Sequence, residues 1–558
     1  MSLKNDLLKF SPRKEQQDCI DFIKAEYLKN KETKFFLLNL PVGVGKSHLA
    51  LMIADFYLKT INGGAKIDII TNSKLLQDQY SSTYESINDL KGKDNYSCDQ
   101  YSCSCAQGAE FNRLNKTKCE TCPHSAARDG FISGKISLTN FYLYTLYALY
   151  MPKMLEARGA NVLIVDECHD YDDVVSDFIT IRFTESIIKR LTFSNESEII
   201  KKLKKVKSIS QYIEFLKDLE GEIGTTISEI ERSLGSQKRT PKSDKRDNKL
   251  SKIFGSKNAD SKLMQIITDL KQYQSKIEIF LKEYNLDSNN WVLENRLNEK
   301  TKQVELSLEP IWAYDYLDKY IFSKYDMVFL MSGTILDKNI FCQLNGLDVT
   351  KSVYYSIDSP FPVKNRQIYY MPLGKMSYRM KEETFKNYVP FIKKILNKYS
   401  DKKGIIHSNS FELASWISRD VDDPRLVYHD SSNKDEVLKE HFESDRPSVI
   451  VSPSMDTGVS FDDDKARFQI IAKIPYPSLA SQKNKLRQKM NPDWYSWKTC
   501  AMLQQACGRC TRSETDFSDT IIIDGSFSDV IKHSSHFLPL WFQEAIKRVD
   551  VKIKANNL

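Results

Sequence analysis

A short loop near the N-terminal end of the chain carries residues suited to binding phosphate. Pro41-Val-Gly-Val-Gly-Lys-Ser47 follows the apolar run Phe35–Leu40 and precedes apolar residues at helical spacing, which predicts a strand–loop–helix unit. Glycines let the backbone amides of such a loop turn toward phosphate oxygens, and the helix N-terminus adds its positive end. Lys46 is placed to reach the β- and γ-phosphates, and the Ser47 hydroxyl to hold Mg²⁺. This pattern usually begins with glycine, and Leu40 stands at that position here.

A pair of carboxylates follows a second apolar run. Asp166 and Glu167 come directly after Asn161–Val165, which reads as a short buried strand. The carboxyl ends of parallel strands are where ligands bind in open α/β sheets. We expect Asp166 to hold Mg²⁺ and Glu167 to orient or activate the attacking water.

A third segment, Leu503–Arg512, carries two arginines and a glutamine. Gln505, Gly508, Arg509 and Arg512 have the spacing i, i+3, i+4 and i+7, which predicts that they share one face of a helix. Such a face suits a γ-phosphate and the charge of its transition state.

Five of the eleven cysteines fall within 25 residues, whereas the other six are scattered. In an intracellular chain such a cluster indicates a metal site before it indicates disulfides. Spacing alone leaves two metals open. Four thiolates can hold a [4Fe–4S] cluster, and four-cysteine sites with a Cys-x-x-Cys pair are also typical of structural zinc. The cysteines of the cluster are Cys98, Cys103, Cys105, Cys119 and Cys122.

Composition and charge limit the class of protein. The 558 residues are 41% hydrophobic and 28% charged, which is ordinary globular usage and predicts two to four domains. No run approaches the ~20 apolar residues of a membrane helix, and MSLKNDLLKF lacks the apolar core of a signal peptide. We therefore expect a soluble intracellular protein with no membrane partner. The net charge of +7 is mild, but Lys238–Lys257 holds eight Lys/Arg against two Asp. This run is either a solvated loop or a contact for a polyanion.

Continuous apolar runs alternate with helical segments in two parts of the chain. This pattern predicts parallel sheets covered on both faces. The intervening residues, rich in Lys, Glu, Ile and Leu, predict a helical insertion. We therefore expect an α/β fold with two parallel-sheet domains and two insertions in the first. The predicted segments are 1–91, 136–182 and 311–345 for the first domain, 92–135 for the cysteine insertion, 183–310 for the helical insertion, and 346–558 for the second domain.

These segments resemble the iron–sulfur superfamily 2 helicases of the XPD/DinG type over nearly the whole chain. The motifs appear in that family's order, and chance does not readily explain an ordered set. They are Arg13-x-x-Gln16, the phosphate loop, Thr71-Asn-Ser73 with Gln79, Lys91–Cys98, Thr139-Asn140, Asp166–His169, Ser332-Gly-Thr-Ile-Leu, Ser359-Pro-Phe-Pro, Ile405–Ser410, Ser452–Gly458, Ile474-Pro-Tyr-Pro and Gln505–Arg512. Three positions depart from the family pattern: Cys168, Gly333 and Ser460.

The resemblance implies an ATP-dependent DNA helicase that moves 5′ to 3′ on single-stranded DNA. The two domains would be RecA-like, with ATP and Mg²⁺ between them, and the helical insertion would correspond to the family's arch. The resemblance also favours [4Fe–4S] over zinc. The partners would be single-stranded DNA and duplex or fork DNA. The protein would be a monomer and would lie in the cytoplasm of a bacterium or of a virus-infected host cell. An ATP-driven translocase or remodeller, and a nucleic-acid-binding ATP switch, are the alternatives.

Individual residues take their roles from the same resemblance. The catalytic residues would be Lys46, Asp166, Glu167, Gln505, Arg509 and Arg512. The nucleotide-binding residues would be Arg13, Gln16, Pro41, Val42, Gly43, Val44, Gly45, Lys46, Ser47, His48, Asp166, Glu167 and Gly458. The cluster ligands would be Cys98, Cys105, Cys119 and Cys122, with Cys103 as the alternative to Cys105, and the Mg²⁺ ligands Ser47 and Asp166. Asp456 and Gly458 would link the nucleotide to the DNA grip.

Overall fold

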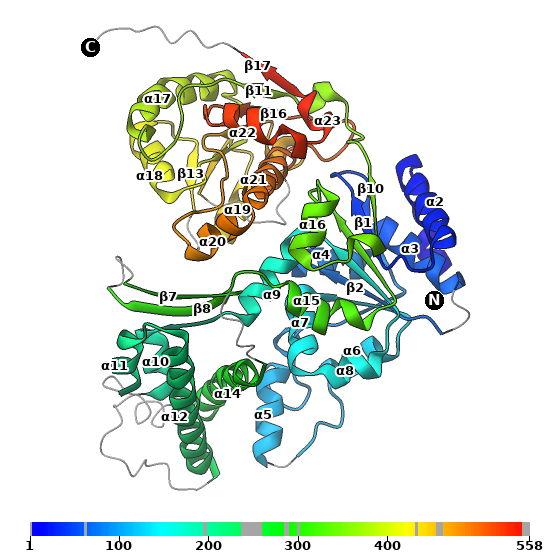
Figure 1. Cartoon of the computed structure of the whole chain (residues 1–558), viewed down its shortest axis with the longest axis vertical. Coiled ribbons are helices and arrows are strands. Elements are labelled where there is room, and N and C mark those ends of the chain that lie inside the picture. The colour runs from blue at the N-terminus through cyan, green and yellow to red at the C-terminus, as the bar shows by residue number, and fades with distance from the viewer. Residues whose placement is uncertain are drawn as a thin grey trace.

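The computed structural model of the chain consists of two parallel-sheet domains, one above the other in Figure 1, with two insertions in the first. It describes residues 3–60, 64–115, 117–193, 198–235, 259–283, 290–297, 302–429, 433–453 and 461–549. Outside these residues lie the basic run at Lys238–Lys257 and three residues of the predicted motifs, Asp456, Gly458 and Ser460. No helix within the described ranges is long and apolar enough to cross a membrane.

The first domain is built on a seven-stranded parallel sheet. Its strands, in spatial order, are β10 (Ser352–Ser356), β1 (Phe35–Asn39), β9 (Met327–Ser332), β5 (Val162–Asp166), β2 (Ile67–Thr71), β4 (Ile136–Asn140) and β3 (Ile87–Asp89). Every residue of β1, β2, β4, β5 and β9 is buried, as the continuous apolar runs predict for a sheet covered on both faces. Its helices are α1 (Leu3–Leu8), α2 (Lys14–Lys29), α3 (Lys46–Thr60), α4 (Lys74–Thr83), α7 (Phe141–Tyr150), α8 (Pro152–Arg158), α9 (Tyr171–Ile179), α15 (Tyr314–Tyr320) and α16 (Lys338–Asn345).

The second domain repeats this plan. Its strands, in spatial order, are β13 (Leu426–Tyr428), β14 (Val449–Ser452), β12 (Gly404–His407), β15 (Phe468–Ile471), β16 (Asp519–Ile522), β11 (Ile368–Tyr370) and β17 (Ile546–Arg548). All of its strand pairs are parallel. Its helices are α17 (Lys381–Lys398), α18 (Phe411–Asp420), α19 (Lys434–Glu443), α20 (Gln482–Met490), α21 (Pro492–Cys507), α22 (Phe527–Ser534) and α23 (Leu540–Gln543). The predicted α/β fold with two parallel sheets is thus confirmed.

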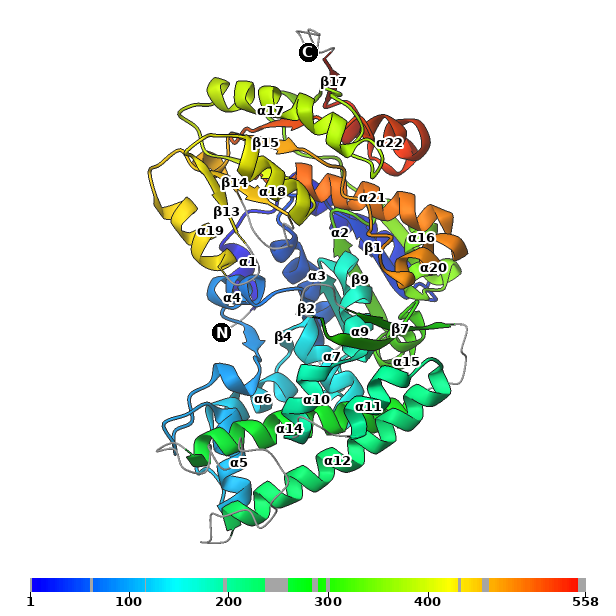
Figure 2. The ribbon, with the colours of Figure 1, turned by 90° about the vertical axis from the view of Figure 1, so that its left-hand side faces the viewer.

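The insertion predicted to be helical also contains strands, and it contacts the cysteine insertion. The segment 183–310 is not wholly helical, because it contributes β7 (Trp291–Leu297) and β8 (Val304–Pro310) to an antiparallel sheet with β6 (Ile181–Thr184). Figure 2 shows its helices lying beside the cysteine insertion. These helices are α10 (Glu185–Thr192), α11 (Glu198–Lys205), α12 (Ile209–Gly235) and α14 (Ala259–Glu283), and those of the cysteine insertion are α5 (Cys105–Asn115) and α6 (Pro123–Ser133). Arg113 of α5 pairs with Glu231 of α12 at 2.7 Å.

The boundary between the domains lies later than predicted. Residues 352–356 form β10, which pairs with β1 at the edge of the first sheet, so the first domain does not end at residue 345. The sequence cannot show this, because β10 is half-exposed at an edge and lacks the continuous apolar run of a central strand. The chain crosses to the second sheet between β10 and β11.

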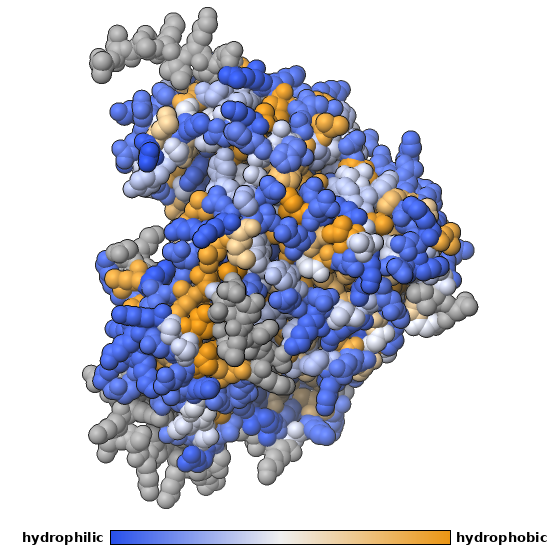
Figure 3. All heavy atoms as spheres, viewed as in Figure 1, coloured by the Kyte–Doolittle hydropathy of each residue, from blue (hydrophilic) through white to orange (hydrophobic). Residues whose placement is uncertain are grey.

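Helices α20 and α21 of the second domain contact the first domain. Arg487 of α20 is buried between the rings of Trp312 and Trp494, 4.9 and 5.5 Å from their centroids. Its guanidinium donates to the Ile311 carbonyl at 2.6 Å and to Asp173 at 3.2 Å. Figure 3 shows a mostly hydrophilic surface, hollowed on its left side between the second domain and the three-stranded sheet.

Candidate active site

The phosphate loop has the conformation that its sequence predicts. Gly43 and Gly45 have φ values of +92° and +80°, a region that residues with a side chain rarely adopt, and α3 begins at Lys46. Gln16 donates to the carbonyls of Val44 at 2.9 Å and Gly45 at 3.1 Å. Arg13 and Gln16, predicted to bind nucleotide, thus hold the loop itself, because Arg13 also donates to the carbonyl of Gly43.

Lys46 and the two carboxylates converge at the end of β5. Lys46 Nζ lies 2.9 Å from Glu167 Oε1. Although burial opposes it, the positive charge of Lys46 holds the pKa of Glu167 below its ordinary value. Asp166 is buried, and this burial, followed by the nearby charge of Glu167, raises its pKa to about 6. The backbone of Glu167 has φ +59°, a strained value for a residue with a side chain, which is typical of functional sites.

The surroundings of Asp166 fit a divalent cation. Its Oδ2 accepts a hydrogen bond from the Tyr80 hydroxyl at 2.9 Å, and its buried Oδ1 has no partner among the described residues. An unpartnered buried carboxylate oxygen costs free energy unless a cation or water compensates for it. Ser47 interacts with the same Tyr80 hydroxyl, so the two predicted Mg²⁺ ligands face one tyrosine. Tyr80 is a site residue that the sequence analysis missed, because a tyrosine within a helix carries no motif signal.

A chain of polar contacts connects Glu167 to the second domain. His169 Nδ1 lies 3.4 Å from Glu167 Oε2 and 2.7 Å from Ser332 Oγ at the end of β9. Ser332 Oγ lies 3.2 Å from Thr334 Oγ1, which accepts from Gln505 Nε2 at 3.2 Å. The predicted Ser332-Gly-Thr motif therefore bridges the carboxylate box and α21.

The glycine that departs from the family pattern has a steric explanation. A Cβ at Gly333 would lie 3.2 Å from the Leu40 carbonyl and 3.6 Å from Pro41 Cα, which is tight for a side chain. Its carbonyl accepts a hydrogen bond from Gln504 at 2.6 Å, so the second domain binds here as well. Gln504 is a further contact that the sequence analysis missed, since the motif draws attention to its neighbour Gln505.

The arginines reach the same cleft, but not from one helix face as predicted. α21 ends at Cys507, and Gly508 lies at its C-terminal cap, so Arg509 and Arg512 belong to the following loop. Arg512 is held by its backbone N–H, which donates to Asp516 at 2.9 Å. Burial lowers the pKa of Arg512, and the negative charge of Glu167 acts against this shift. Arg512 thus faces the Lys46–Glu167 pair from the second domain.

A cleft of 610 Å³ between the two domains brings the predicted residues together. Lys46 and Glu167 line it from the first domain, and Gln505, Arg509 and Arg512 from the second. Its size is in the range of small-molecule sites, and its cations suit a polyphosphate. Gln79, from the Thr71-Asn-Ser73 motif region, also lines it.

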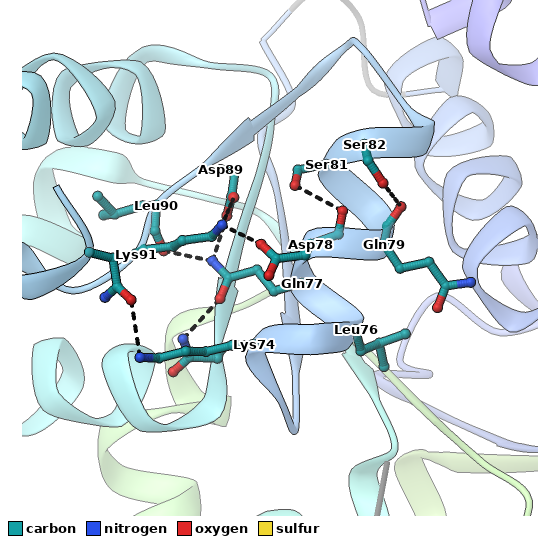
Figure 4. Close-up of polar contacts among 12 residues, drawn as sticks. Lys74, Leu76, Gln77, Asp78, Gln79, Ser81, Ser82, Asp89, Leu90 and Lys91 are labelled. Atoms are coloured by element: carbon teal, nitrogen blue, oxygen red, sulfur yellow. Dashed lines mark hydrogen bonds and ion pairs between the residues drawn. The ribbon is translucent and has the colours of Figure 1, made fainter. Parts of the chain in front are cut away.

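Two glutamines of α4 have different roles. Gln77 donates to the Leu90 carbonyl at 2.9 Å and accepts from Asn140 at 2.9 Å, which ties α4 to the sheet. Figure 4 shows Gln77 pointing toward Asp89 and Leu90, whereas Gln79 points away from them. Gln79 is therefore available to the cleft and Gln77 is structural.

The five clustered cysteines gather in the first insertion. Cys98 contacts Cys103 and Cys119, and Cys105 contacts Cys122, all through their thiols. A Cβ at position 108 would lie 2.5 Å from Cys98 Sγ, so Gly108 of α5 leaves the room that this thiol occupies. Within the described part of the chain, however, no group of three or more His, Cys, Asp or Glu is arranged to hold a metal. The thiols alone suit a soft metal centre, but their positions do not decide between Cys103 and Cys105.

Comparisons with known proteins agree with this architecture. Residues 9–215 match the family model described as type III restriction enzyme, res subunit, and residues 393–545 match the helicase C-terminal domain. A solved XPD helicase structure superimposes with a TM-score of 0.61 at 14% identity, covering 97% of this chain and 100% of that one. The structure of S. tokodaii Xpd4 gives 0.56 at 13% identity, with 96% and 100% covered.

The two parallel-sheet domains have the fold of the solved XPD structures, and the second of them matches the helicase C-terminal domain. The ATP-dependent DNA helicase CHL1 of Vanderwaltozyma polyspora is 22% identical over 493 residues. That match covers 73% of this chain and 56% of the relative, so this chain corresponds to little more than half of the relative's length. These matches are to proteins of the type that the sequence motifs resemble, the superfamily 2 helicases of the XPD/DinG type.

Proposed function

We propose that the protein is an ATP-dependent DNA helicase that moves on single-stranded DNA. The observation that supports this most strongly is the meeting of Lys46 and Glu167 from one domain with Arg512 from the other in a single cleft. The Lys46 ammonium binds the β- and γ-phosphates, Glu167 orients and deprotonates water, and Arg512 stabilises the charge of the transition state. Mg²⁺ supplies charge neutralisation at the phosphates when bound, with Asp166 and Ser47 as its protein ligands.

The hydrogen bonds that cross the cleft support a coupling between the nucleotide site and the position of the second domain. Closure brings Gln505 to Thr334, and hydrogen bonds from Thr334 through Ser332 reach His169, which lies 3.4 Å from Glu167 Oε2. Cleft closure and water activation are therefore linked, and cyclic opening and closing moves the two domains relative to each other along the strand. The 5′ to 3′ direction, the fork or duplex preference and the monomeric, cytoplasmic state are part of this proposal and derive from the family resemblance.

Strand displacement on two matched duplexes, one with a 5′ and one with a 3′ single-stranded tail, tests the proposal directly. We expect ATP-dependent release from the 5′-tailed duplex alone, and no release by the Lys46→Ala variant. Release from neither duplex, with hydrolysis still stimulated by single-stranded DNA, favours a translocase that clears proteins or R-loops. Hydrolysis that single-stranded DNA does not stimulate favours the ATP switch.

We further propose that the first insertion holds a [4Fe–4S] cluster on Cys98, Cys105, Cys119 and Cys122. The support is an all-thiol donor set and the space that Gly108 leaves beside Cys98. Anaerobically purified protein is expected to contain close to four irons per chain, the number in such a cluster. Stoichiometric zinc without iron contradicts the proposal, and separate Cys103→Ser and Cys105→Ser variants identify the fourth ligand by loss of iron.

A further inference from the structure

A buried tyrosine connects helix α4 to the carboxylate at the end of β5. The Tyr80 hydroxyl donates to Asp166 Oδ2 at 2.9 Å, and both side chains are buried. The side chain of Ser47 contacts the same hydroxyl. Asp166 Oδ1, in contrast, has no hydrogen-bond partner among the residues that the structure describes. Tyr80 therefore occupies one oxygen of the carboxylate and leaves the other available to a ligand.

Helix α4 holds Tyr80 in this position. Gln77 lies one turn earlier on the same face of the helix and, like Tyr80, is fully buried. Its amide donates to the Leu90 carbonyl at 2.9 Å and accepts from Asn140 at 2.9 Å. Figure 4 shows Gln77 directed toward Leu90, in the segment that follows β3. Because these bonds fix the helix, they also fix the Tyr80 hydroxyl at the end of β5.

The hydroxyl orients the carboxylate without neutralising it. The terminal torsion of an aspartate is broad, so a carboxylate that no side chain holds can take many orientations. A tyrosine hydroxyl is uncharged near neutral pH, so its hydrogen bond leaves the negative charge of Asp166 available to a cation. Lys46 does not take that charge, because its ammonium pairs with Glu167 at 2.9 Å. The backbone of Glu167 also contacts the carboxylate, but within the described part of the chain Tyr80 is the only side chain that donates to it.

The orientation of a carboxylate matters most for a cation with strict geometry. Mg²⁺ requires a near-ideal octahedron of oxygens at about 2.0–2.1 Å and is usually bound through only one or two protein carboxylates. A carboxylate that must first be turned into place binds such an ion more weakly. In metal sites generally, a hydrogen-bond partner of a ligand changes the affinity for the metal by about 10–100-fold.

We propose that Tyr80 is a positioning residue for Mg²⁺ and that its hydroxyl holds Asp166 so that Oδ1 is available to the metal. This inference rests on the proposed ATPase function and adds a residue that sets the affinity of the site for the cation. Helix α4 also contributes Gln79 to the cleft. One helix therefore supports the metal ligand and lines the nucleotide cleft.

Nucleotide binding with and without Mg²⁺ tests the inference without requiring hydrolysis. A fluorescent, non-hydrolysable ATP analogue is titrated once with excess Mg²⁺ and once with EDTA, and the ratio of the two affinities is the Mg²⁺ enhancement. Tyr80→Phe keeps the ring that packs beside Tyr84 and removes only the hydroxyl. We expect the enhancement to fall by about tenfold or more in this variant. The affinity in EDTA should stay within about twofold of wild type, because the phosphate loop and Lys46 are unchanged.

A second buried tyrosine provides the matched control. Tyr57 lies in α3, the helix that follows the phosphate loop, and is as fully buried as Tyr80. Its hydroxyl has no hydrogen-bond partner among the described residues. Tyr57→Phe therefore removes the same group at the same depth without touching Asp166, and it should change neither affinity.

The same titrations define the results that overturn the inference. It is wrong if Tyr80→Phe leaves the enhancement unchanged, if the affinity falls equally with Mg²⁺ and with EDTA, or if wild type shows no enhancement. Added to Asp166→Asn, Tyr80→Phe should cause no further loss, because the charged ligand that it positions is gone, and a second full loss also contradicts the role. A wild type that shows the enhancement but does not hydrolyse ATP contradicts the proposed function alone, and the ratio still decides on Tyr80.

Discussion

Replacing Glu167 by Gln separates nucleotide binding from hydrolysis. The substitution keeps the shape of the side chain and removes the charge that pairs with Lys46 at 2.9 Å. A nucleotide must take Lys46 from this pair, whose side chains are 14% and 25% exposed. A charge-assisted pair that is only partly open to water is worth on the order of 1–2 kcal/mol, so freeing Lys46 should tighten ATP binding by about five- to thirtyfold. Loss of the base should lower the hydrolysis rate by about 10²–10⁴-fold.

Two measurements on the same variant check these opposite effects. Equilibrium binding of a fluorescent ATP analogue gives the affinity, and single-turnover phosphate release with saturating single-stranded DNA gives the rate. Glu412→Gln, in α18 of the second domain and paired with Lys381 at 2.6 Å, changes the same charge away from the cleft and should alter neither quantity. Weaker binding with an unchanged rate would refute both the role of Glu167 as the base and that of Lys46 as the phosphate ligand.

Three further predictions concern stability and the cysteine insertion. Arg158 and Asp68 form a buried pair at 2.9 Å, so Arg158→Met should cost ~3–5 kcal/mol of unfolding free energy in a urea titration, and Asp68→Asn added to it should recover part of this loss. Gly108→Ala should lower the iron content per chain by crowding Cys98, and metal analysis with an unchanged iron content would contradict this. Burial lowers the pKa of His441 to about 4, so the unfolded chain takes up the proton first as pH falls from about 6.5 to 4, and stability is lost in that window. The loss from this group is ~2 kcal/mol at pH 5, so His441→Asn should lose less stability than wild type between about pH 7.5 and 5.

The sequence predicts those parts of the site in which the functional residues lie next to one another in a single short segment. The phosphate loop and the Asp166-Glu167 pair each follow one buried strand, and the end of a parallel strand fixes where they lie. Local pattern and tertiary position therefore agree, and both predictions of placement hold. The same applies to Gln505, because it lies within α21.

The sequence does not predict the position of a side chain correctly where contacts between distant parts of the chain determine that position. Helical spacing places Arg512 on the face of Gln505, but the helix ends at Cys507, and a hydrogen bond from the Arg512 backbone N–H to Asp516 positions Arg512 instead. Likewise, Phe361 stands in the Ser359-Pro-Phe-Pro motif, yet its packing on Gly43 depends on how the linker passes the loop. A pattern within one sequence segment cannot indicate a contact of this kind.

The contacts between the two domains differ in strength, and this determines where the cleft can open. At the nucleotide, Gln505 donates to Thr334 at 3.2 Å and Gln504 to the Gly333 carbonyl at 2.6 Å. Both bonds are neutral, each is worth about 1 kcal/mol, and they can be remade in each cycle. At the far contact, Lys498 and Arg487 bind Asp173 at 2.9 and 3.2 Å. Charge-assisted bonds of this kind are roughly twice as strong as neutral ones. The domains should therefore separate first at the nucleotide and pivot about Asp173, so that nucleotide binding works against the weaker set of bonds while the stronger set keeps the two domains in register.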